Sequence, residues 1–418
     1  MHKPAIGLIC PFWLPLWGGA EQYHFRLASK LQERGFPVKV FCGVAEAENR
    51  ENGNLSVERY APLRNIRPGW WGRALHTRAD EDFGTISDHY EFMSEAVRWA
   101  KSTGVRIALI GNPFNDPRLF HAREMYRRLQ DINIKVGLVH HDLSSEIGTN
   151  LRKVYFNGKC DWNTATKMVA TSLNKLAEKG PHMKWTAMAG SPLFFEPDFF
   201  ISNSDWATQF IDPLDKCPKI TLHPPMDNDF WQSESGSPPT LTKVDVLMVN
   251  PQNRKNPKLM KEIIERSPDS TTFRILKGGW GDSFSIFRQL IEPLPEQKKA
   301  QIDFVEYVDD MRDAYRSSRV LVFPSFEEGY GMTPVEAMYC GLPVVSSDYP
   351  AIGEAVGDAA HTLCPYRTTA EDWIAAIEHA LDNEEMWKNR SLQRSYILEQ
   401  RQEEEFTQLC EFLSGICH

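Results

Sequence analysis

Two carboxylates, Glu328 and Glu336, stand on either side of a short loop that contains Gly329 and Gly331. Glycine can adopt backbone angles that a Cβ atom forbids. The residues from Thr333 to Glu336 predict the start of a helix, with Thr as the N-cap and Pro at the first helical position. A helix N-terminus directs unpaired amides and the positive end of the helix dipole towards one point, which favours an anion there.

Acidic side chains beside an anion site require an explanation. Sugar hydroxyls provide one, because a single carboxylate can accept two of them at once. The two glutamates and the helix start therefore indicate that a phosphorylated sugar binds here. The alternative is an ordinary strand-loop-helix unit with a capping box, in which Glu336 folds back onto the backbone amide of Thr333.

The elements that would hold this site can be read on either side of the loop. Residues 320–324 form an apolar run that predicts a buried parallel strand ending at Pro324. The predicted helix ends at Gly341, and the residues from Pro343 to Ser347 predict the next strand. A strand that opens through a glycine loop onto a helix is typical of doubly wound α/β sheets.

The same stretch resembles the donor-site signature of retaining glycosyltransferase family 4. The residues that carry the resemblance are Glu328, Gly329, Gly331, Pro334, Glu336, Ala337, Gly341 and Pro343-Val344-Val345. This family consists of GT-B enzymes that use nucleotide sugars. The resemblance implies an α/β fold with two Rossmann-like domains facing each other across a cleft, and a C-terminal helix that crosses back to the first domain.

This interpretation divides the chain into three parts. Residues 1–235 are predicted to form an N-terminal acceptor-binding Rossmann-like domain, and residues 236–390 a C-terminal domain that binds the nucleotide sugar. Residues 391–418 are predicted to form a crossover helix that packs on the N-terminal domain. The Ser-, Gly- and Pro-rich segment from Gln232 to Thr240 reads as the linker. A chain of 418 residues is long enough for two full cores.

The N-terminus predicts a strand, turn and helix. A strand from Ala5 to Ile9 precedes the turn Gly18-Gly19, and a helix from about Ala20 to Arg34 follows, with an apolar face at helical spacing. The turn lacks the Gly-x-Gly-x-x-Gly fingerprint, which argues against a nicotinamide enzyme. The resemblance implies that Gly18 and Gly19 face the donor diphosphate, whereas the alternative is a simple tight turn.

A histidine pair follows the predicted strand from Ile134 to Val139. Neighbouring strand residues point to opposite faces, so His140 and His141 cannot both line one pocket without a bend, which argues against a metal site formed with Asp142. The resemblance implies that His141 contacts the transferred sugar. A purely structural histidine is the alternative.

The resemblance also assigns roles to the second predicted domain. Lys255 and Arg254 would neutralise the leaving diphosphate, although Asn250 stands where the family has an arginine at the strand end and Asn256 replaces a common glycine. Glu328 would hold the hydroxyls of the donor sugar and Glu336 those of the ribose. The backbone groups implied in donor binding are those of Gly331, Met332 and Thr333 for the diphosphate and those around Tyr307 and Val308 for the base.

The implied reaction is transfer of a hexose-type sugar with retention of configuration, without a protein nucleophile. The sequence places no Asp-x-Asp motif at this site, so neither a metal ion nor a cofactor is expected beyond the nucleotide-diphosphate sugar itself. The acceptor would be a glycan, a lipid-linked sugar or a small molecule. The rival interpretations are a non-catalytic nucleotide-sugar binder and another GT-B enzyme, such as a sugar-nucleotide epimerase or a phosphorylase.

The overall composition limits the partners and the location. A formal net charge of −9 gives no reason to expect nucleic acid. Apolar runs of membrane-spanning length, a signal-peptide pattern and Cys-x-x-Cys pairs are all absent from the sequence, which indicates a cytoplasmic protein. The segment from Arg64 to Arg73 interleaves cations with two tryptophans. It could touch the inner face of a membrane or stack on a glycan, and a solvated loop is the alternative that we favour.

Overall fold

The computed structural model describes residues 3–10, 13, 19–43, 55–60, 86–111, 119–141, 164, 167–168, 171, 196–211, 217–233, 241–277 and 283–417. Several predictions lie outside these ranges. They concern Gly18, Asp142, the segment 64–73 and most of the linker from Gln232 to Thr240.

The described residues form two compact units. Residues Met1–Pro225 and Gln402–His418 make the first unit, and residues Met226–Arg401 make the second. The long C-terminal helix α17, Glu384–Gly415, contributes residues to both, because Arg401 and Gln402 are neighbours within it. The roles predicted for the two domains, acceptor binding in the first and donor binding in the second, stay predictions.

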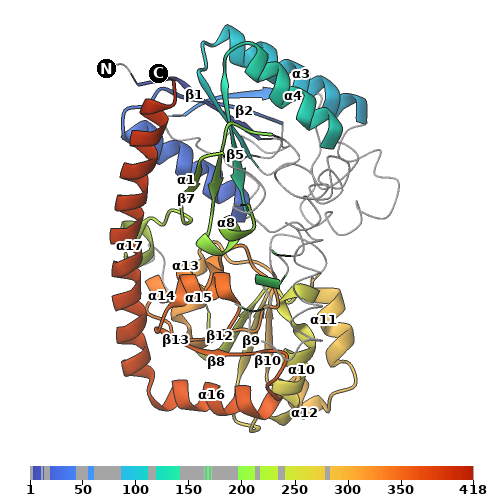
Figure 1. Ribbon diagram of the computed structural model, residues 1–418. Coiled ribbons are helices and arrows are strands. Elements are labelled where there is room, and N and C mark those ends of the chain that lie inside the picture. The colour runs from blue at the N-terminus through green and yellow to red at the C-terminus, as the bar shows by residue number, and fades with distance from the viewer. Residues whose placement is uncertain are drawn as a thin grey trace. The chain divides into compact units, whose positions relative to one another are not determined.

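The first unit is built on a seven-stranded sheet of order β3-β2-β1-β4-β5-β6-β7 (Figure 1). All of its neighbouring strands are parallel. The strands are β1 Ile6–Cys10, β2 Val38–Gly43, β3 Ser56–Tyr60, β4 Ile107–Gly111, β5 Lys135–His140, β6 Phe199–Ser202 and β7 Lys219–Thr221.

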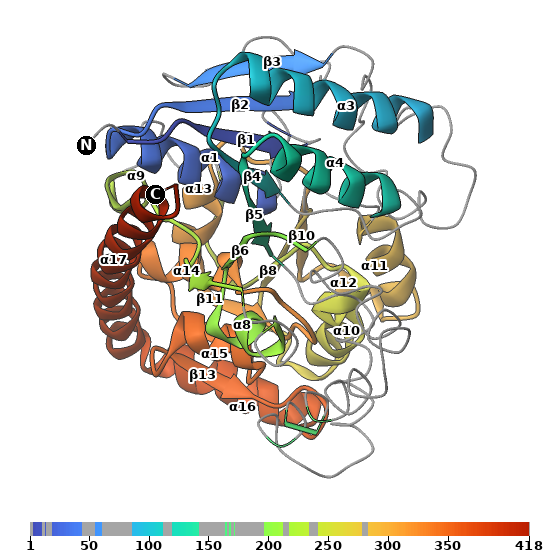
Figure 2. The same cartoon turned by 45° about the horizontal axis from the view of Figure 1, so that its top comes forward.

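Helices cover both faces of this sheet. Successive strand residues point to opposite sides, so each strand contributes side chains to two separate cores. Ile9 and Phe41 pack into a core formed with the helices α3, Ile86–Ser102, and α4, Leu119–Asp131. These two helices run side by side in Figure 2. Leu8 and Val40 pack into a second core with α1, Gly19–Glu33, and with the end of α17. A short helix, α8 Asp205–Ile211, follows β6.

The second unit is built on a six-stranded parallel sheet of order β10-β9-β8-β11-β12-β13. The strands are β8 Val244–Val249, β9 Phe273–Leu276, β10 Ile302–Val305, β11 Ser318–Phe323, β12 Val344–Ser347 and β13 Ala360–Leu363. The helical segments are α9 Asn228–Gln232, η2 Asn253–Lys255, α10 Pro257–Arg266, α11 Ser283–Ile291, α12 Glu296–Lys299, α13 Met311–Arg316, α14 Met332–Tyr339, α15 Pro350–Val356 and α16 Ala370–Asp382.

The two parallel sheets with helices between their strands confirm the predicted α/β class. Apolar runs in the sequence predict all of the described strands except β3, β7 and β13, which lie at sheet edges. An edge strand is covered less completely than a central one, so its sequence lacks a continuous apolar run. Helix α3 was also missed, although Phe92, Ala96 and Ala100 recur on its buried face at helical spacing.

The predicted N-cap of α14 was wrong by two residues. Helix α14 begins at Met332 with Gly331 as its N-cap, whereas the sequence suggested Thr333. Helix α13 is capped by Asp310, whose side chain accepts a hydrogen bond from the Arg312 amide at 2.9 Å. Within the described ranges, none of the helices combines the length with the apolarity that a membrane span requires.

Candidate functional site

The order of the second sheet defines where a ligand is expected. The chain proceeds from β8 through β9 to β10 towards one edge, and from β11 through β12 to β13 towards the other. The switch point therefore lies between β8 and β11, which pair directly. Open α/β sheets bind ligands at the carboxyl ends of the strands at such a point. The two loops that leave it are residues 250–256 and 324–331.

Two asparagines shape the loop after β8. Asn250 and Asn256 both have positive φ angles, 57° and 55°. Asparagine tolerates this left-handed conformation better than most residues, so Asn256 can stand in the place of a glycine. The Asn256 side chain then caps α10 by accepting a hydrogen bond from the Leu259 amide at 3.3 Å. The two departures from the family pattern thus have a structural role.

An ion pair joins the two loops. Lys255 Nζ contacts Glu328 Oε1, and these residues are 73 positions apart in the chain. Ser325 Oγ donates a second hydrogen bond to the same carboxylate oxygen at 2.6 Å. The loops are also joined through the backbone, because Arg254 O accepts a hydrogen bond from the Phe326 amide at 2.8 Å. Lys255 and Glu328, predicted separately, therefore belong to one cluster.

The cluster is charged although it is buried. Burial alone would raise the pKa of Glu328, but the charges of Lys255 and Arg254, with hydrogen bonds from Lys255 and Ser325, lower the pKa below its ordinary value. Lys255 is 7% exposed, and its Nζ lies 4.2 Å from the centre of the Phe323 ring. The site thus holds a carboxylate that is ionised at neutral pH and a cation with little access to water.

Helix α14 begins at the end of the second loop. Gly331 has a φ of 108°, a conformation that residues with a Cβ atom rarely adopt. A glycine N-cap has no side chain with which to bind the amides of the first turn. The residues expected to contact a diphosphate, Gly331, Met332 and Thr333, therefore form an N-terminus that is not capped in the usual way.

Glu336 does not form the capping box that the alternative interpretation required, since Thr333 is not the N-cap. Its Oε2 accepts a hydrogen bond of 2.7 Å from the hydroxyl of Tyr315, and both residues are buried. Burial, and then the negative charge of Glu336, raise the pKa of Tyr315 well above its ordinary value. The tyrosine therefore stays protonated and fixes the orientation of the carboxylate.

The residues predicted to contact the base follow β10. Tyr307 is 69% exposed, and Val308 is half-buried. Strand β10 lies two places from β8 in the sheet, with β9 between them. Tyr307 and Val308 therefore lie at the same carboxyl edge as the Lys255–Glu328 pair, but no bond links the two places in the part of the chain that the structure describes.

The first unit has its own switch point, between β1 and β4. Gly19 is the first residue of α1, in line with the predicted strand-turn-helix unit. His141 directly follows β5 and is buried, and its Nε2 lies 2.9 Å from Nε2 of His24 on α1. The sequence analysis did not identify His24 as a partner of His141.

Ser325 and Tyr315 were also missed. Ser325 precedes the glycine loop and could have been noticed as a hydroxyl three residues before Glu328. Tyr315 has no local signal, because it reaches Glu336 from another helix, 21 residues earlier in the chain.

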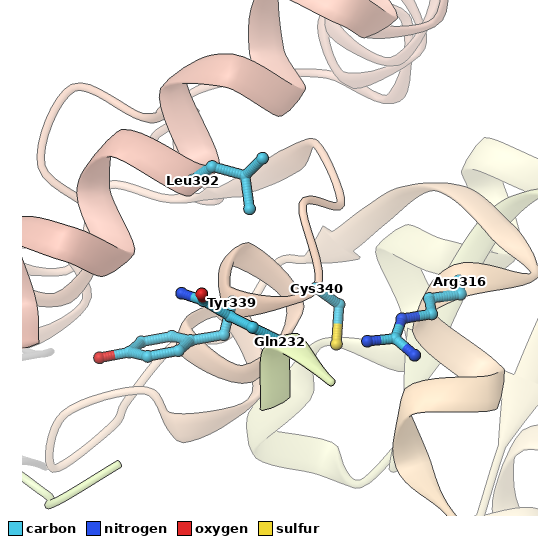
Figure 3. A pocket seen from close by; sticks show the side chains of 5 residues that line it. All are labelled: Gln232, Arg316, Tyr339, Cys340 and Leu392. Atoms are coloured by element: carbon cyan, nitrogen blue, oxygen red, sulfur yellow. The ribbon is translucent and has the colours of Figure 1, made fainter. Parts of the chain in front are cut away.

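A separate cavity of about 450 Å³ lies in the second unit (Figure 3). It is lined by Gln232, Arg316, Tyr339, Cys340 and Leu392. Figure 3 shows Arg316 pointing towards Cys340, with Leu392 approaching from α17. Tyr339 and Cys340 stand at the C-terminal end of α14, whereas the predicted donor residues stand at its N-terminal end, so this cavity is not the candidate site.

Comparisons with known sequences match the second unit to a protein family. Residues 246–383 match the family model described as glycosyl transferases group 1. The O-antigen chain mannosyltransferase B of Escherichia coli is 37% identical over 113 residues, which cover 25% of this chain and 29% of that protein. A D-inositol 3-phosphate glycosyltransferase of Corynebacterium aurimucosum is 22% identical over 298 residues, covering 66% of this chain and 68% of that protein. The alignment with the mannosyltransferase thus spans less than a third of its length.

Solved structures match almost the whole chain. Sucrose-phosphate synthase from Thermosynechococcus elongatus superimposes with a TM-score of 0.70 at 15% identity, covering 98% of this chain and 99% of that one. Anabaena HepE in complex with UDP and glucose gives a TM-score of 0.66 at 14% identity, covering 99% of this chain and 100% of that one. The chain therefore has the GT-B fold, and its second unit carries the sequence pattern of the group 1 glycosyl transferases.

Proposed function

We propose that this chain is a retaining glycosyltransferase of family 4. It moves a hexose-type sugar from a nucleotide-diphosphate sugar to a glycan, a lipid-linked sugar or a small-molecule acceptor, without a metal ion. The observation that carries the proposal is the buried pair of Lys255 and Glu328 at the switch point of the second sheet, beside the glycine-capped start of α14.

The leaving diphosphate determines what the site must do. As the bond to the donor sugar breaks, negative charge develops on the diphosphate and positive charge on the sugar ring. Lys255, Arg254 and the amides of Gly331, Met332 and Thr333 stabilise the diphosphate electrostatically, with little reorganisation because the loops are already tied together.

The two glutamates have different roles in this proposal. Glu328 pairs with Lys255, and it accepts hydrogen bonds from the donor sugar once the diphosphate supplies Lys255 with a second anion. Glu336 accepts hydrogen bonds from the ribose in the orientation that Tyr315 imposes. Main-chain groups at Tyr307 and Val308 bind the base.

The first unit supplies the remaining contacts. His141 touches the transferred sugar, and Gly18 and Gly19 face the diphosphate. Similar proteins suggest which nucleotide sugars to test first as donors. Two of the proteins with similar sequences are O-antigen chain mannosyltransferases, and several matching structures were determined with UDP. A glycan or lipid-linked acceptor would bring a cytoplasmic enzyme to the inner face of the membrane.

Two experiments test the proposal. In the first, the melting temperature of the full chain is measured with UDP-, GDP- and ADP-sugars, for the wild type and for Lys255→Ala and Glu328→Ala. At least one nucleotide sugar should stabilise the wild type, and the two variants should respond less. The proposal fails if no nucleotide sugar stabilises the wild type, or if both variants respond like it.

The second experiment separates an enzyme from its rivals. A nucleotide sugar that stabilises the protein is incubated with it, and the products are followed by NMR with and without EDTA. Release of the nucleotide diphosphate and a product with the anomeric configuration of the donor are expected, unchanged by EDTA. Stabilisation without turnover would favour a non-catalytic binder, and an isomerised nucleotide sugar would favour an epimerase.

A further inference from the structure

A pair of histidines is buried at the switch point of the first unit. His24 lies in the second turn of α1, and His141 is the first residue after β5. Their side chains are 3% and 6% exposed, and their Nε2 atoms are 2.9 Å apart. This is hydrogen-bonding distance, so one of the two nitrogens must carry a proton and the other a lone pair.

Both rings are neutral at physiological pH. Burial lowers the pKa of His24 to about 3. Burial, and then the proximity of His24 and His140, lowers the pKa of His141 well below its ordinary value. A neutral imidazole has one N–H group and one lone pair. The contact between the two Nε2 atoms therefore couples the tautomers of the two rings, because one Nε2 must carry its proton and the other must not.

The tautomer of His141 decides how the ring can meet a substrate. Its Nε2 is engaged by His24, which leaves Nδ1 as the nitrogen that can bind a sugar hydroxyl. If His141 Nε2 accepts the hydrogen bond from His24, Nδ1 carries the proton and is a donor, and if Nε2 donates the hydrogen bond, Nδ1 is an acceptor. His24 therefore sets the hydrogen-bonding role of the other side of the ring.

Other residues hold the pair in place. The ring of Tyr23 packs edge-on against His141 with their centres 4.6 Å apart. Asn203 Nδ2 donates a hydrogen bond of 2.7 Å to the backbone carbonyl of His141. Gly111, at the end of β4, leaves room for His24, because a Cβ atom there would lie only 2.3 Å from His24 Cε1. The fold thus reserves space for this particular ring.

We propose that His24 is a positioning residue, which fixes the tautomer and the orientation of His141 so that its Nδ1 meets a hydroxyl of the transferred sugar. The contact with a sugar rests on the proposed function. The control of the His141 ring by His24 does not, and it can be measured without a substrate.

The ring control is tested by NMR on the full chain with ¹⁵N-labelled histidine. The variants are His24→Gln, whose amide nitrogen can reach the position of Nε2, and His24→Leu, which cannot form the bond. At pH 7 the His141 signals should show one fixed tautomer in the wild type and in His24→Gln, and a changed or mixed tautomer in His24→Leu. An unchanged His141 tautomer in His24→Leu would overturn the proposal.

The catalytic consequence is tested with the same variants. Loss of one positioning hydrogen bond should lower kcat roughly tenfold in His24→Leu, and His24→Gln should recover most of the rate. The Kd of UDP should not change, because neither His24 nor His141 is among the residues proposed to bind the nucleotide. His361→Leu, on the edge strand β13, serves as the matched control and should keep the wild-type kcat.

The possible results separate the two proposals. Equal loss of kcat in His24→Leu and His24→Gln would overturn the positioning role. An unchanged kcat in His24→Leu would do the same. If the wild type shows no turnover of any nucleotide sugar, the proposed function fails, and the NMR result alone then decides whether His24 controls the His141 ring. As a second variant, Gly111→Ala should displace His24 and reproduce the NMR change of His24→Leu.

Discussion

Replacing Lys255 by methionine removes one charge from the buried ion pair of the second unit. Methionine keeps much of the length of lysine and its contact with the ring of Phe323, but it has no charge. The side chains of Lys255 and Glu328 are 9% and 10% exposed. In the variant, Glu328 keeps the hydrogen bond from Ser325 and the field of Arg254 but loses its ion-pair partner.

The magnitude follows from this burial. Removing one partner of a buried ion pair costs about 3–5 kcal/mol of unfolding free energy, because the other charge stays inside without compensation. The double variant Lys255→Met/Glu328→Gln should regain most of this loss, since glutamine can still accept the hydrogen bond from Ser325. The matched control is Lys261→Met, because Lys261 pairs with Glu265 on the surface of α10. That change should cost no more than about 0.5 kcal/mol.

The loss should also depend on pH. In the wild type the folded-state pKa of Glu328 is lowered, so its ionisation stabilises the protein above the unfolded-state pKa, and this contribution disappears as the pH falls through the folded-state value. In Lys255→Met, burial dominates and should raise the pKa of Glu328 instead. The stability difference between variant and wild type should therefore shrink when the pH is lowered from 7 to 5.

Urea unfolding followed by tryptophan fluorescence provides the assay, because Trp373 lies in the core of the second unit. Two results would refute the reasoning. One is a Lys255→Met protein that is as stable as Lys261→Met. The other is a double variant that is as unstable as the single one, since the loss would then come from packing and not from an uncompensated charge.

Three further predictions concern other parts of the two sites. The folded-state pKa of His24 is about 3, below its unfolded value of 6.5, so the stability of the protein should fall as the pH drops below 6.5. His24 alone should lower the free energy of unfolding by about 2 kcal/mol at pH 5, as measured by urea unfolding. A stability that does not depend on pH would contradict this prediction. Tyr315→Phe should weaken UDP binding about tenfold by releasing Glu336, measured by calorimetry, whereas an unchanged Kd would show that the Tyr315 hydroxyl is not needed. Gly331→Ala should cost about 1–2 kcal/mol, because its φ is 108°, and equal thermal stability would contradict this strain.

The central strands of both sheets could be predicted because they are buried on both faces. Apolar runs such as Val320–Phe323 and Val344–Val345 have few other interpretations. Edge strands such as Ser56–Tyr60 carry polar residues and lack this signal. The start of α14 was displaced by two residues because Thr333 looked like a good N-cap, whereas the chain uses the positive φ of Gly331 instead.

The parts of the candidate site that could be predicted are those whose residues lie close together along the chain. The spacing of Glu328 and Glu336 around a glycine loop is visible without a structure. The contact between Lys255 and Glu328 joins two strands that are neighbours in the sheet but distant in the chain, so it depends on strand order. The same holds for Tyr315 with Glu336 and for His24 with His141, whose partners meet only after the sheets have formed.

A crystal structure of the full chain with the nucleotide sugar that most raises its melting temperature would test the central claim most directly. The diphosphate should lie within hydrogen-bonding distance of the Met332 and Thr333 amides and of Lys255 Nζ, with the ribose on Glu336. A diphosphate bound away from the ends of β8 and β11, or a ribose that does not touch Glu336, would contradict the account.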